Sequence, residues 1–286
     1  MLATLNEVLA TAEERKIAIG AFNAANLESL QAIVMAAEEL NLPVIMQFAQ
    51  CHEEWVSIDV IGPVMIQEAK RAKVPVCVHL DHGEDLTYVR RALELGFTSV
   101  MYDGSTLPYE ENLKNSIEAV KLAKRYSANV EAELGSMGKR EYGDGDASKE
   151  DETKIYTDPD LAKEFVEKTG IDALACSFGT THGIYLKKPR LDFEVIKAVR
   201  QKTNGIPVVM HGGSGVSRED YKKAIEAGVR KINYFTYMDK AGGNAVADYI
   251  KNENPNPIFF SSMSMLARSV MKDNIVQAMK MFANLD

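Results

Sequence analysis

The alternation of short, β-branched apolar runs with longer amphipathic stretches is the feature that most restricts the fold of this chain. Apolar runs without polar alternation are typical of strands buried on both faces, and helices between such strands favour a parallel sheet. Eight strand–helix pairs favour a closed (β/α)8 barrel, a TIM barrel, over an open doubly wound sheet. The eight predicted strands are Ala18–Asn23, Pro43–Phe48, Pro75–Asp81, Ser99–Gly104, Asn129–Gly135, Ile171–Ser177, Ile206–Gly212 and Lys231–Thr236.

A helix is predicted after each strand, and local signals mark some of the helix starts. Asp158 followed by Pro159 offers a cap with proline at the first helical position, and Ser217 begins a sequence that resembles a capping box. No low-complexity linker interrupts the pattern, so we expect one domain over residues 1–286. The predicted helices lie near Asn26–Leu40, Ser57–Ala72, Asp85–Leu95, Pro108–Ser127, Pro159–Lys168, Phe193–Thr203, Ser217–Ala227 and Lys240–Asn252, with an extra C-terminal helix near Met263–Phe282.

One connection is longer than a barrel turn requires. Ser136–Thr157, after the fifth strand, is charged, contains glycine and lacks helical periodicity. Loops of this length in a compact domain are mostly lids, binding loops or disordered segments. We therefore expect a mobile loop at the catalytic end of the barrel, with a solvated insertion of no function as the alternative.

Composition and charge exclude several classes of function. The formal net charge of -8 argues against nucleic acid or an anionic membrane as the main partner. No apolar run approaches the roughly 20 residues that cross a bilayer, and Met1–Glu7 has no signal-peptide pattern. Three cysteines without CxxC spacing predict reduced, buried thiols in a cytoplasmic protein.

Polar residues stand at the carboxyl ends of the predicted strands, where barrel enzymes place their catalytic groups. Three of them are histidines, His82, His182 and His211, and a glycine follows each one. Three imidazoles with an open fourth position are a catalytic zinc site, although a lone histidine beside a strand is more often a hydrogen-bonded core residue. The other polar residues at this level are Asn23, Asp81, Asp103, Glu133, Ser177 and Asn233.

The two remaining histidines and one glycine-rich turn complete this set. We expect His79 to be structural or to support the ligands, and His52 to be a surface or loop histidine. Gly212-Gly213-Ser214-Gly215 follows the seventh strand and leads into a helix. Backbone amides, a hydroxyl and a helix N-terminus together favour an anion, and barrels often bind phosphate in this loop.

With these residues together, the chain resembles the class II, metal-dependent ketose-bisphosphate aldolases, which include fructose- and tagatose-1,6-bisphosphate aldolases. The resemblance covers nearly the whole chain, and its length is similar to that of the shorter, tagatose-type branch. Its most specific segments are His79-Leu80-Asp81-His82-Gly83, Met101-Tyr102-Asp103-Gly104-Ser105, Val130-Glu131-Ala132-Glu133-Leu134-Gly135, Tyr156-Thr157-Asp158-Pro159, Gly179-Thr180-Thr181-His182-Gly183-Ile184-Tyr185 and His211-Gly212-Gly213-Ser214-Gly215.

The resemblance implies zinc-dependent cleavage of a phosphorylated ketose into dihydroxyacetone phosphate and an aldehyde such as glyceraldehyde 3-phosphate. One Zn2+ per subunit would be held by the three histidines, with Asp103 and Glu133 as alternative or supporting ligands. Asp81 would exchange a proton with the aldehyde oxygen, and Glu141 in the long loop would take the proton of the donor ketone.

Substrate binding and assembly follow from the same resemblance. A monovalent cation, Na+ or K+, is expected near the carbonyls of Gly183 and Gly212, and the small-molecule partner is a sugar phosphate. Family members are homodimers or homotetramers. The residues expected to grip the phosphate and hydroxyls are Asn23, Gly183, Gly212, Gly213, Ser214, Asn233 and Thr236.

The departures from the family pattern concern the aldehyde end of the substrate. Lys139-Arg140 stand where Gly-Gly often precedes the loop glutamate, and Phe235 and Tyr237 replace acidic residues. Ala49 replaces a frequent serine, and the C-terminal Pro-Arg pair is missing. The alternatives are therefore a class II aldolase with a different, non-bisphosphate substrate and, less favoured, a non-catalytic partner subunit or a zinc hydrolase.

Overall fold

The computed structural model describes residues 1–135, 139–140, 156–185 and 188–285. Within these residues, eight parallel strands pair in the order β4-β3-β2-β11-β10-β8-β6-β5, and pairing of β4 with β5 closes the barrel. The predicted TIM barrel is therefore confirmed. The strands are β2 (Ile19–Asn23), β3 (Val44–Ala49), β4 (Val76–Gly83), β5 (Ser99–Tyr102), β6 (Asn129–Leu134), β8 (Ala173–Cys176), β10 (Val208–Met210) and β11 (Val229–Tyr234).

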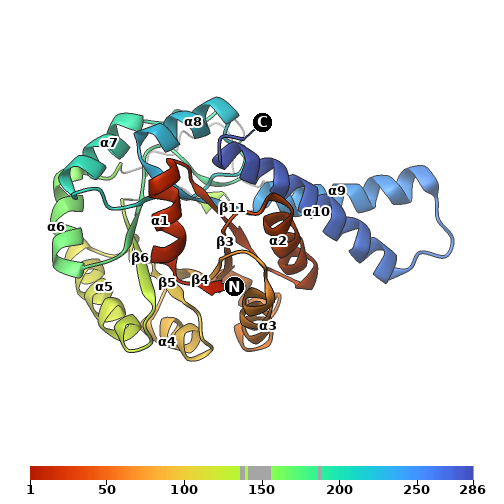
Figure 1. Ribbon diagram of the computed structural model, residues 1–286, viewed down its shortest axis with the longest axis horizontal. Helices are drawn as coiled ribbons and strands as arrows, with labels where there is room; N and C mark the ends of the chain where they lie inside the picture. The colour runs from red at the N-terminus through yellow and green to blue at the C-terminus, as the bar shows by residue number, and fades with distance from the viewer. Residues whose placement is uncertain (136–138, 141–155, 186–187, 286) are drawn as a thin grey trace.

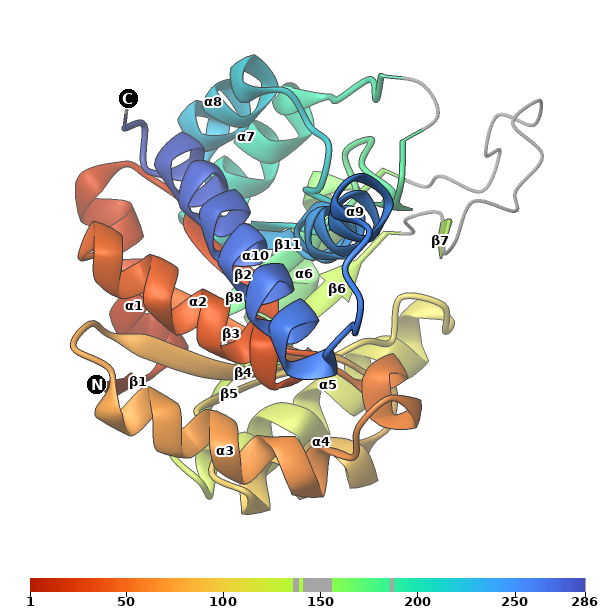
Figure 2. The ribbon, with the colours of Figure 1, turned by 90° about the vertical axis from the view of Figure 1, so that its right-hand side faces the viewer.

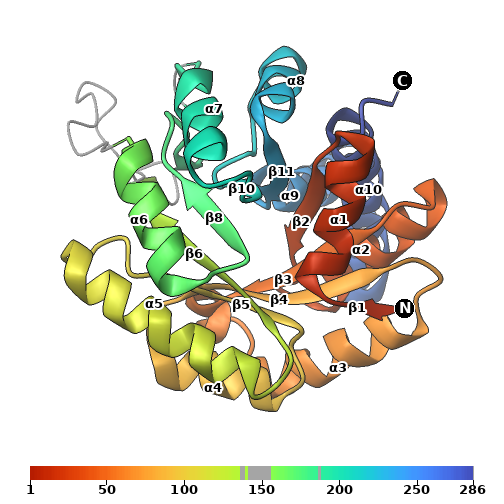
Figure 3. The same cartoon turned by 60° about the vertical axis from the view of Figure 1, so that its left-hand side comes forward.

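Helices surround the strands as an outer ring (Figure 3). Buried aliphatic side chains on their inner faces pack against the strands, which are buried on both sides. The predicted order of strands and helices holds throughout. The helices after the strands are α2 (Leu27–Leu40), α3 (Ile58–Arg71), α4 (Leu86–Glu94), α5 (Tyr109–Lys124), α6 (Pro159–Thr169), α7 (Phe193–Lys202), α8 (Arg218–Ala227), α9 (Thr236–Glu253) and α10 (Phe260–Phe282).

The N-terminal segment forms two elements that the sequence pattern did not predict. β1 (Leu2–Ala3) pairs with β4, and α1 (Leu5–Arg15) lies across the ring of strands with one apolar side buried (Figure 1). A capping box between Thr4 and Glu7 starts α1. α1 therefore covers the N-terminal end of the barrel, opposite the end where strand-terminal polar residues collect.

The last two helices form a hairpin that projects from the barrel (Figures 1 and 2). α10 returns along α9 and packs against α2, which confirms the extra C-terminal helix. α9 begins at Thr236, four residues before the predicted start at Lys240. The helix N-terminus is therefore placed directly after β11, at the mouth of the barrel.

The long connection after β6 is described in part. β7 (Lys139–Arg140) pairs in parallel with β9 (His182–Gly183), so the start of the connection runs beside a predicted zinc ligand. Glu141 and the expected mobility of this loop lie outside the described residues. Within the described part of the chain, no helix is both long and apolar enough to span a membrane.

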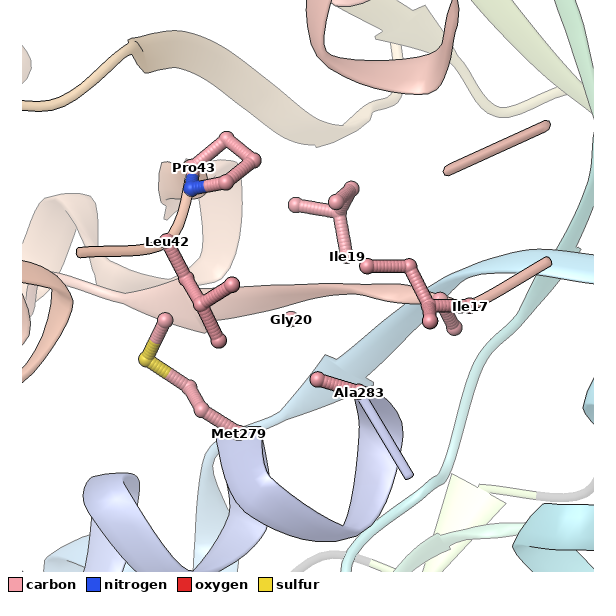
Figure 4. A pocket seen from close by; sticks show the side chains of 8 residues that line it. Ile17, Ile19, Gly20, Leu42, Pro43, Met279 and Ala283 are labelled. Carbon is pink, nitrogen blue, oxygen red and sulfur yellow. The ribbon is translucent and has the colours of Figure 1, made fainter. Parts of the chain in front are cut away.

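A small cavity of about 10 Å³ lies between β2 and α10, near the N-terminal end of the barrel (Figure 4). Its side chains are apolar, including Ile17, Leu42 and Met279. It is about as large as one water molecule and offers no polar side chain, so it carries no site.

Candidate active site and metal centre

Three histidines lie together at the mouth of the barrel. His82 stands near the end of β4, His182 in β9 and His211 directly after β10. Their ring centroids are separated by 4.6 Å (His82–His211), 4.9 Å (His82–His182) and 5.7 Å (His182–His211). Ligand atoms of all three lie within 4.8 Å of one another. The structure thus brings together the residues predicted to hold zinc.

Asp103 orients the first of these rings. Its Oδ2 lies 2.7 Å from His82 Nδ1, so Nε2 is the nitrogen that faces His211. His82 has a φ of 47°, a region that non-glycine residues seldom adopt, and the Asp103 contact helps to hold it there. A carboxylate on the outer nitrogen fixes the ring and makes a ligand imidazole more basic. Together with Glu133, this pair also forms a second group able to hold a metal.

Glu131 and Lys231 orient His211 from inside the barrel. Glu131 Oε1 lies 2.8 Å from His211 Nε2, and Lys231 Nζ lies 2.8 Å from Glu131 Oε2. All three side chains are fully buried. Burial opposes ionisation of Glu131, but Lys231, His211 and His79 together outweigh it and lower the pKa of this carboxyl to about 2. An ionised Glu131 accepts the Nε2 proton, which leaves the Nδ1 lone pair directed at His82.

The carboxylates around the cluster favour a positive charge at His82, whereas burial lowers the pKa of His182 and of His211 and favours their neutral forms. Burial opposes protonation of His82, but the carboxylates of Asp81 and Asp103 outweigh it and raise the pKa of the ring to about 10. Burial and the nearby Asp103 raise the pKa of Glu133 well above its usual range. His182 Nε2 and Glu133 Oε2 are buried without a hydrogen-bond partner in the described part of the chain. The imidazole nitrogens and the carboxylates around them are donors that fit a divalent metal cation.

Asp81, beside His82, is held by three side-chain amides. Asn23 Nδ2 and Gln47 Nε2 donate to its Oδ2 at 3.0 and 3.1 Å, and Asn233 Nδ2 donates to its Oδ1 at 3.0 Å. Burial opposes ionisation, yet His82 and neighbouring cationic groups hold the pKa of Asp81 well below its usual range. Asn23 and Asn233, which we predicted to contact substrate, therefore also fix the carboxylate.

The glycine turn after β10 lies in close contact with the backbone at Thr181. Gly212 has a φ of 62°, and a Cβ there would lie 2.3 Å from the Thr181 carbonyl oxygen, so only glycine fits. The Tyr185 hydroxyl accepts from Thr181 N at 3.0 Å and donates to Gly212 O at 2.8 Å. This hydroxyl joins the turn to the segment after His182. Gly183 also has positive φ, at 90°.

Two further predicted phosphate ligands flank this turn. Ser214 Oγ accepts from Phe235 N at 3.2 Å, and Thr236 opens α9. Gly213 N donates to the Asn233 carbonyl oxygen at 3.0 Å, which ties the turn to the end of β11. The turn and the start of α9 therefore face the same cavity, and the N-terminus of α9 favours an anion there.

One cavity of about 420 Å³ contains most of the predicted site. His52 lines it as well, and only 5% of its surface is exposed, so the prediction of a surface histidine was wrong. The ring is buried because it packs against both Trp55 and Phe235, and local sequence does not reveal the contact with Phe235, which follows β11. The predicted site residues that line the cavity are Asn23, Asp81, His82, His182, Gly183, Gly212, Gly213, Ser214, Asn233 and Thr236.

Comparison with known proteins identifies the fold and the site as those of one enzyme family. A family model described as "Fructose-bisphosphate aldolase class-II" matches residues 3–286. The chain belongs to the class II fructose-bisphosphate aldolases. It is therefore an aldolase, a carbon–carbon lyase, and this family is generally zinc-dependent.

Individual aldolases agree with this assignment. The chain is 37% identical to "Probable fructose-bisphosphate aldolase" of Bacillus subtilis (strain 168), over 99% of this chain and 98% of the relative. It is 38% identical to "Fructose-bisphosphate aldolase" of Staphylococcus aureus (strain Mu50 / ATCC 700699), over 88% of this chain and 87% of the relative. The crystal structure of the YdjI aldolase from Escherichia coli K12 superimposes with a TM-score of 0.86 at 35% identity, over 99% of this chain and 97% of that one. These names do not favour a non-catalytic partner subunit.

Several residues of this aldolase site were missed from the sequence. Gln47 and Glu131 point into the barrel from β3 and β6, and Lys231 from β11, each from within a strand rather than at its end. A charged residue inside an otherwise apolar strand was the available signal, since a buried charge requires a partner. His79 Nδ1 lies 2.9 Å from Ser99 Oγ and Nε2 lies 3.5 Å from Lys231 Nζ, so this ring belongs to the supporting network, as predicted.

Proposed function

We propose that this aldolase reversibly cleaves a phosphorylated ketose of the fructose- or tagatose-1,6-bisphosphate type into dihydroxyacetone phosphate and an aldehyde such as glyceraldehyde 3-phosphate. The observation that carries the proposal is the placement of three groups in one cavity. The three-histidine cluster, the Asp81 carboxylate and the glycine turn at Gly212 all face it or lie at its floor. One cavity can thus polarise a substrate carbonyl, transfer a proton and bind a phosphate.

Zinc is the cofactor that fits these donors. His82, His182 and His211 would hold it, with Asp103 and Glu133 as supporting or alternative ligands. When bound, Zn2+ supplies a Lewis acid that polarises the donor carbonyl. The support for two of these nitrogens is the outward anchoring of His82 by Asp103 and of His211 by Glu131, which leaves one nitrogen of each ring for a metal. The third is the buried His182 Nε2, which has no hydrogen-bond partner among the described residues.

Asp81 is proposed to move the proton of the aldehyde oxygen. In cleavage its ionised carboxylate removes the proton from the hydroxyl that becomes the aldehyde, and in condensation it returns this proton. The amides of Asn23, Gln47 and Asn233 hold both oxygens in place, so little reorganisation precedes the transfer. Glu141, which follows β7 in the sequence, is proposed as the base that takes the proton of the donor ketone.

The donor half is proposed to bind through its phosphate. Gly183, Gly212 and Ser214 would supply backbone and hydroxyl donors, and Thr236 at the start of α9 would complete the site. Gly213, whose N–H already donates to Asn233, would give the phosphate room to approach the turn. Asn23 and Asn233 would contact the hydroxyls of this half.

Three further expectations remain part of the proposal. A monovalent cation, Na+ or K+, would bind carbonyls near Gly183 and Gly212. The chain would form a homodimer or homotetramer, supported by apolar side chains on the projecting hairpin, where Phe260 is 85% exposed. A cytoplasmic location is supported by the free, buried thiols of Cys77 and Cys176. The partner is a small sugar phosphate, with no nucleic acid and no membrane.

Metal analysis combined with a cleavage panel tests the proposed function. Purified protein should contain one zinc per chain, and removal of zinc with a chelator should abolish cleavage until zinc is restored. The panel compares fructose 1,6-bisphosphate, tagatose 1,6-bisphosphate and the corresponding 1-phosphates. Zinc-loaded protein that releases dihydroxyacetone phosphate from none of these ketoses would disprove the proposal.

A further inference from the structure

Three aromatic rings form one side of the cavity, and we name them the aromatic wall: His52, Trp55 and Phe235. The His52 ring stacks on Trp55 with centroids 4.5 Å apart and planes inclined by 14°. Phe235 lies 4.9 Å from His52 and 6.2 Å from Trp55, between ring centroids. All three line the cavity that holds Asp81. The wall joins the segment after β3 to the segment after β11.

The aromatic wall lies beside Asp81 in the cavity. η1 (Gln50–Glu54), which carries His52, directly follows β3, and Ala49 at the end of β3 pairs with Asp81 on β4. The charge of Asp81 is close enough to act on the His52 ring. Since Asp81 is proposed to exchange its proton with the aldehyde oxygen, atoms beyond that oxygen would extend along this wall.

The wall is held rigidly from its outer side. Glu53 lies between His52 and Trp55 in the sequence. Its carboxylate accepts from Ser57 Oγ at 3.0 Å, Ile58 N at 2.9 Å and the Tyr88 hydroxyl at 2.6 Å. Arg91 Nη1 donates to the same carboxylate at 3.1 Å. These contacts tie η1 to α3 and α4. The wall is therefore a preformed surface, as binding sites for small molecules usually are.

Two properties of the wall indicate a ligand. Trp55 is 51% exposed although it lies in a cavity, so a large aromatic face is available for contact. His52 is 5% exposed, and its Nδ1 is buried with no hydrogen-bond partner among the described residues. An unsatisfied buried nitrogen is costly. A flip of the ring exchanges Nδ1 with Cδ2, so this nitrogen can turn to the other side of the ring and bond a ligand hydroxyl.

The charges around the wall do not suit a phosphate. Among the described residues that line the cavity, the carboxyl groups that adjoin η1 are Glu54, within it, and Glu84, whose N–H donates to Gln50 Oε1. Asp239 and Lys240 lie in the first turns of α9. Carboxylates repel a dianionic phosphate but accept hydrogen bonds from hydroxyls. Phosphate donors are instead gathered at the glycine turn and the start of α9.

We propose that the aromatic wall binds the aldehyde half of the substrate, and that it accepts uncharged polyhydroxy aldehydes. The carbon chain stacks on Trp55, and a hydroxyl bonds the imidazole of His52. The inference rests on the proposed aldol reaction but concerns only the acceptor, and the phosphate-bearing donor half stays as described above.

Condensation kinetics with matched acceptors test this proposal. The zinc-loaded enzyme is given dihydroxyacetone phosphate with D-glyceraldehyde, D-erythrose or D-glyceraldehyde 3-phosphate. The kcat/KM for the better uncharged aldehyde should equal or exceed that for the phosphorylated one. Trp55→Ala should lower kcat/KM for the uncharged aldehydes by roughly tenfold through KM, as expected for a lost stacking contact, whereas Trp55→Phe retains most of it.

Two controls separate binding from folding. Leu161→Ala removes a comparably exposed apolar side chain on α6, outside the cavity, and should leave both aldehydes unaffected. Trp55 is the single tryptophan of the chain, so its fluorescence reports acceptor binding in Asp81→Asn protein, where condensation is blocked. A change in Trp55 fluorescence that is half-complete at an aldehyde concentration near KM supports the contact between Trp55 and the acceptor. Fluorescence that stays unchanged at aldehyde concentrations above KM overturns it.

A measurement of the donor reaction distinguishes the two proposals. Exchange of the dihydroxyacetone phosphate proton with solvent needs no aldehyde. If the zinc-loaded enzyme does not catalyse this exchange, the proposed aldol reaction is itself wrong. The second outcome is proton exchange together with a kcat/KM for glyceraldehyde 3-phosphate that is at least tenfold above that for the uncharged aldehydes and is unchanged in Trp55→Ala. This outcome would overturn the aromatic wall as the acceptor site and leave the aldol reaction intact.

Discussion

Lys231 Nζ lies 2.8 Å from Glu131 Oε2, and both side chains are completely buried beneath the histidine cluster. Glu131 uses its other oxygen to hold His211. The ammonium group thus keeps ionised the carboxylate that directs His211 Nδ1 towards His82 in the histidine cluster. A buried pair of this kind contributes to function by fixing one protonation state rather than by adding stability.

Lys231→Met tests this arrangement. Removing one partner of a buried ion pair leaves an uncompensated charge, so we expect a loss of about 3–5 kcal/mol in the free energy of unfolding. Zinc affinity should fall by roughly 10–100-fold because His211 loses its orientation. Urea unfolding and competition with a chelator measure the two effects. Lys223→Met, which breaks an exposed pair with Glu219, is the matched control. A Lys231→Met protein with normal zinc affinity would contradict the positioning role.

Asp81→Asn should separate proton transfer from metal binding. The amide cannot take the proton of the ketose hydroxyl, so we expect cleavage to slow by roughly 10²–10⁴-fold. Zinc content should stay at the wild-type value because the three histidines are unchanged. Initial rates of cleavage and metal analysis of the same preparation measure both. Substantial remaining cleavage would move the proton-transfer role away from Asp81.

Glu141→Ala should block the donor half of the reaction. Without this carboxylate, the proton of dihydroxyacetone phosphate would no longer exchange with solvent deuterium, which proton NMR follows directly. Zinc content and unfolding should be unaffected, as controls. Exchange at the wild-type rate would assign the base role to another group.

The projecting hairpin predicts how the chain assembles. Phe259 and Phe260 are 61% and 85% exposed at its tip, and apolar side chains this accessible are typical of contact surfaces. The double variant Phe259→Ser, Phe260→Ser should lower the molar mass measured by light scattering. The exposed Leu27, at the start of α2, provides a control variant, Leu27→Ser. An unchanged mass would place the subunit contact elsewhere.

The barrel and the clustering of the three histidines could be predicted because both depend on local sequence. Buried parallel strands are continuous apolar runs, and barrel enzymes place their reactive side chains where those runs end. His82, His182 and His211 all follow this rule, and so does Asp81. The predicted strand positions were accurate to a few residues for the same reason.

The remaining parts depend on contacts between distant segments. Lys231 is covered only because Glu131, a hundred residues earlier, faces it across the barrel. The burial of His52 depends partly on Phe235, whose ring centroid lies 4.9 Å from that of His52. Neither packing contact leaves a periodic signal in one segment. α1 was missed although the Thr4–Glu7 capping box was readable in the sequence.

His52→Gln tests how the buried imidazole couples stability to pH. Burial lowers the pKa of His52 to about 4, below its ordinary value of 6.5. Between these values the unfolded chain binds a proton that the folded protein does not, so the stability from this residue is complete above pH 6.5. It is lost as the pH falls towards 4, by at most about 3 kcal/mol. Unfolding free energies of zinc-free wild type and His52→Gln at pH 7 and pH 5 measure the effect. The variant should lose less stability than the wild type between these two pH values, because glutamine does not titrate, while the other buried histidines contribute equally to both proteins. Equal losses in the two proteins would show that His52 is not held neutral by the aromatic wall.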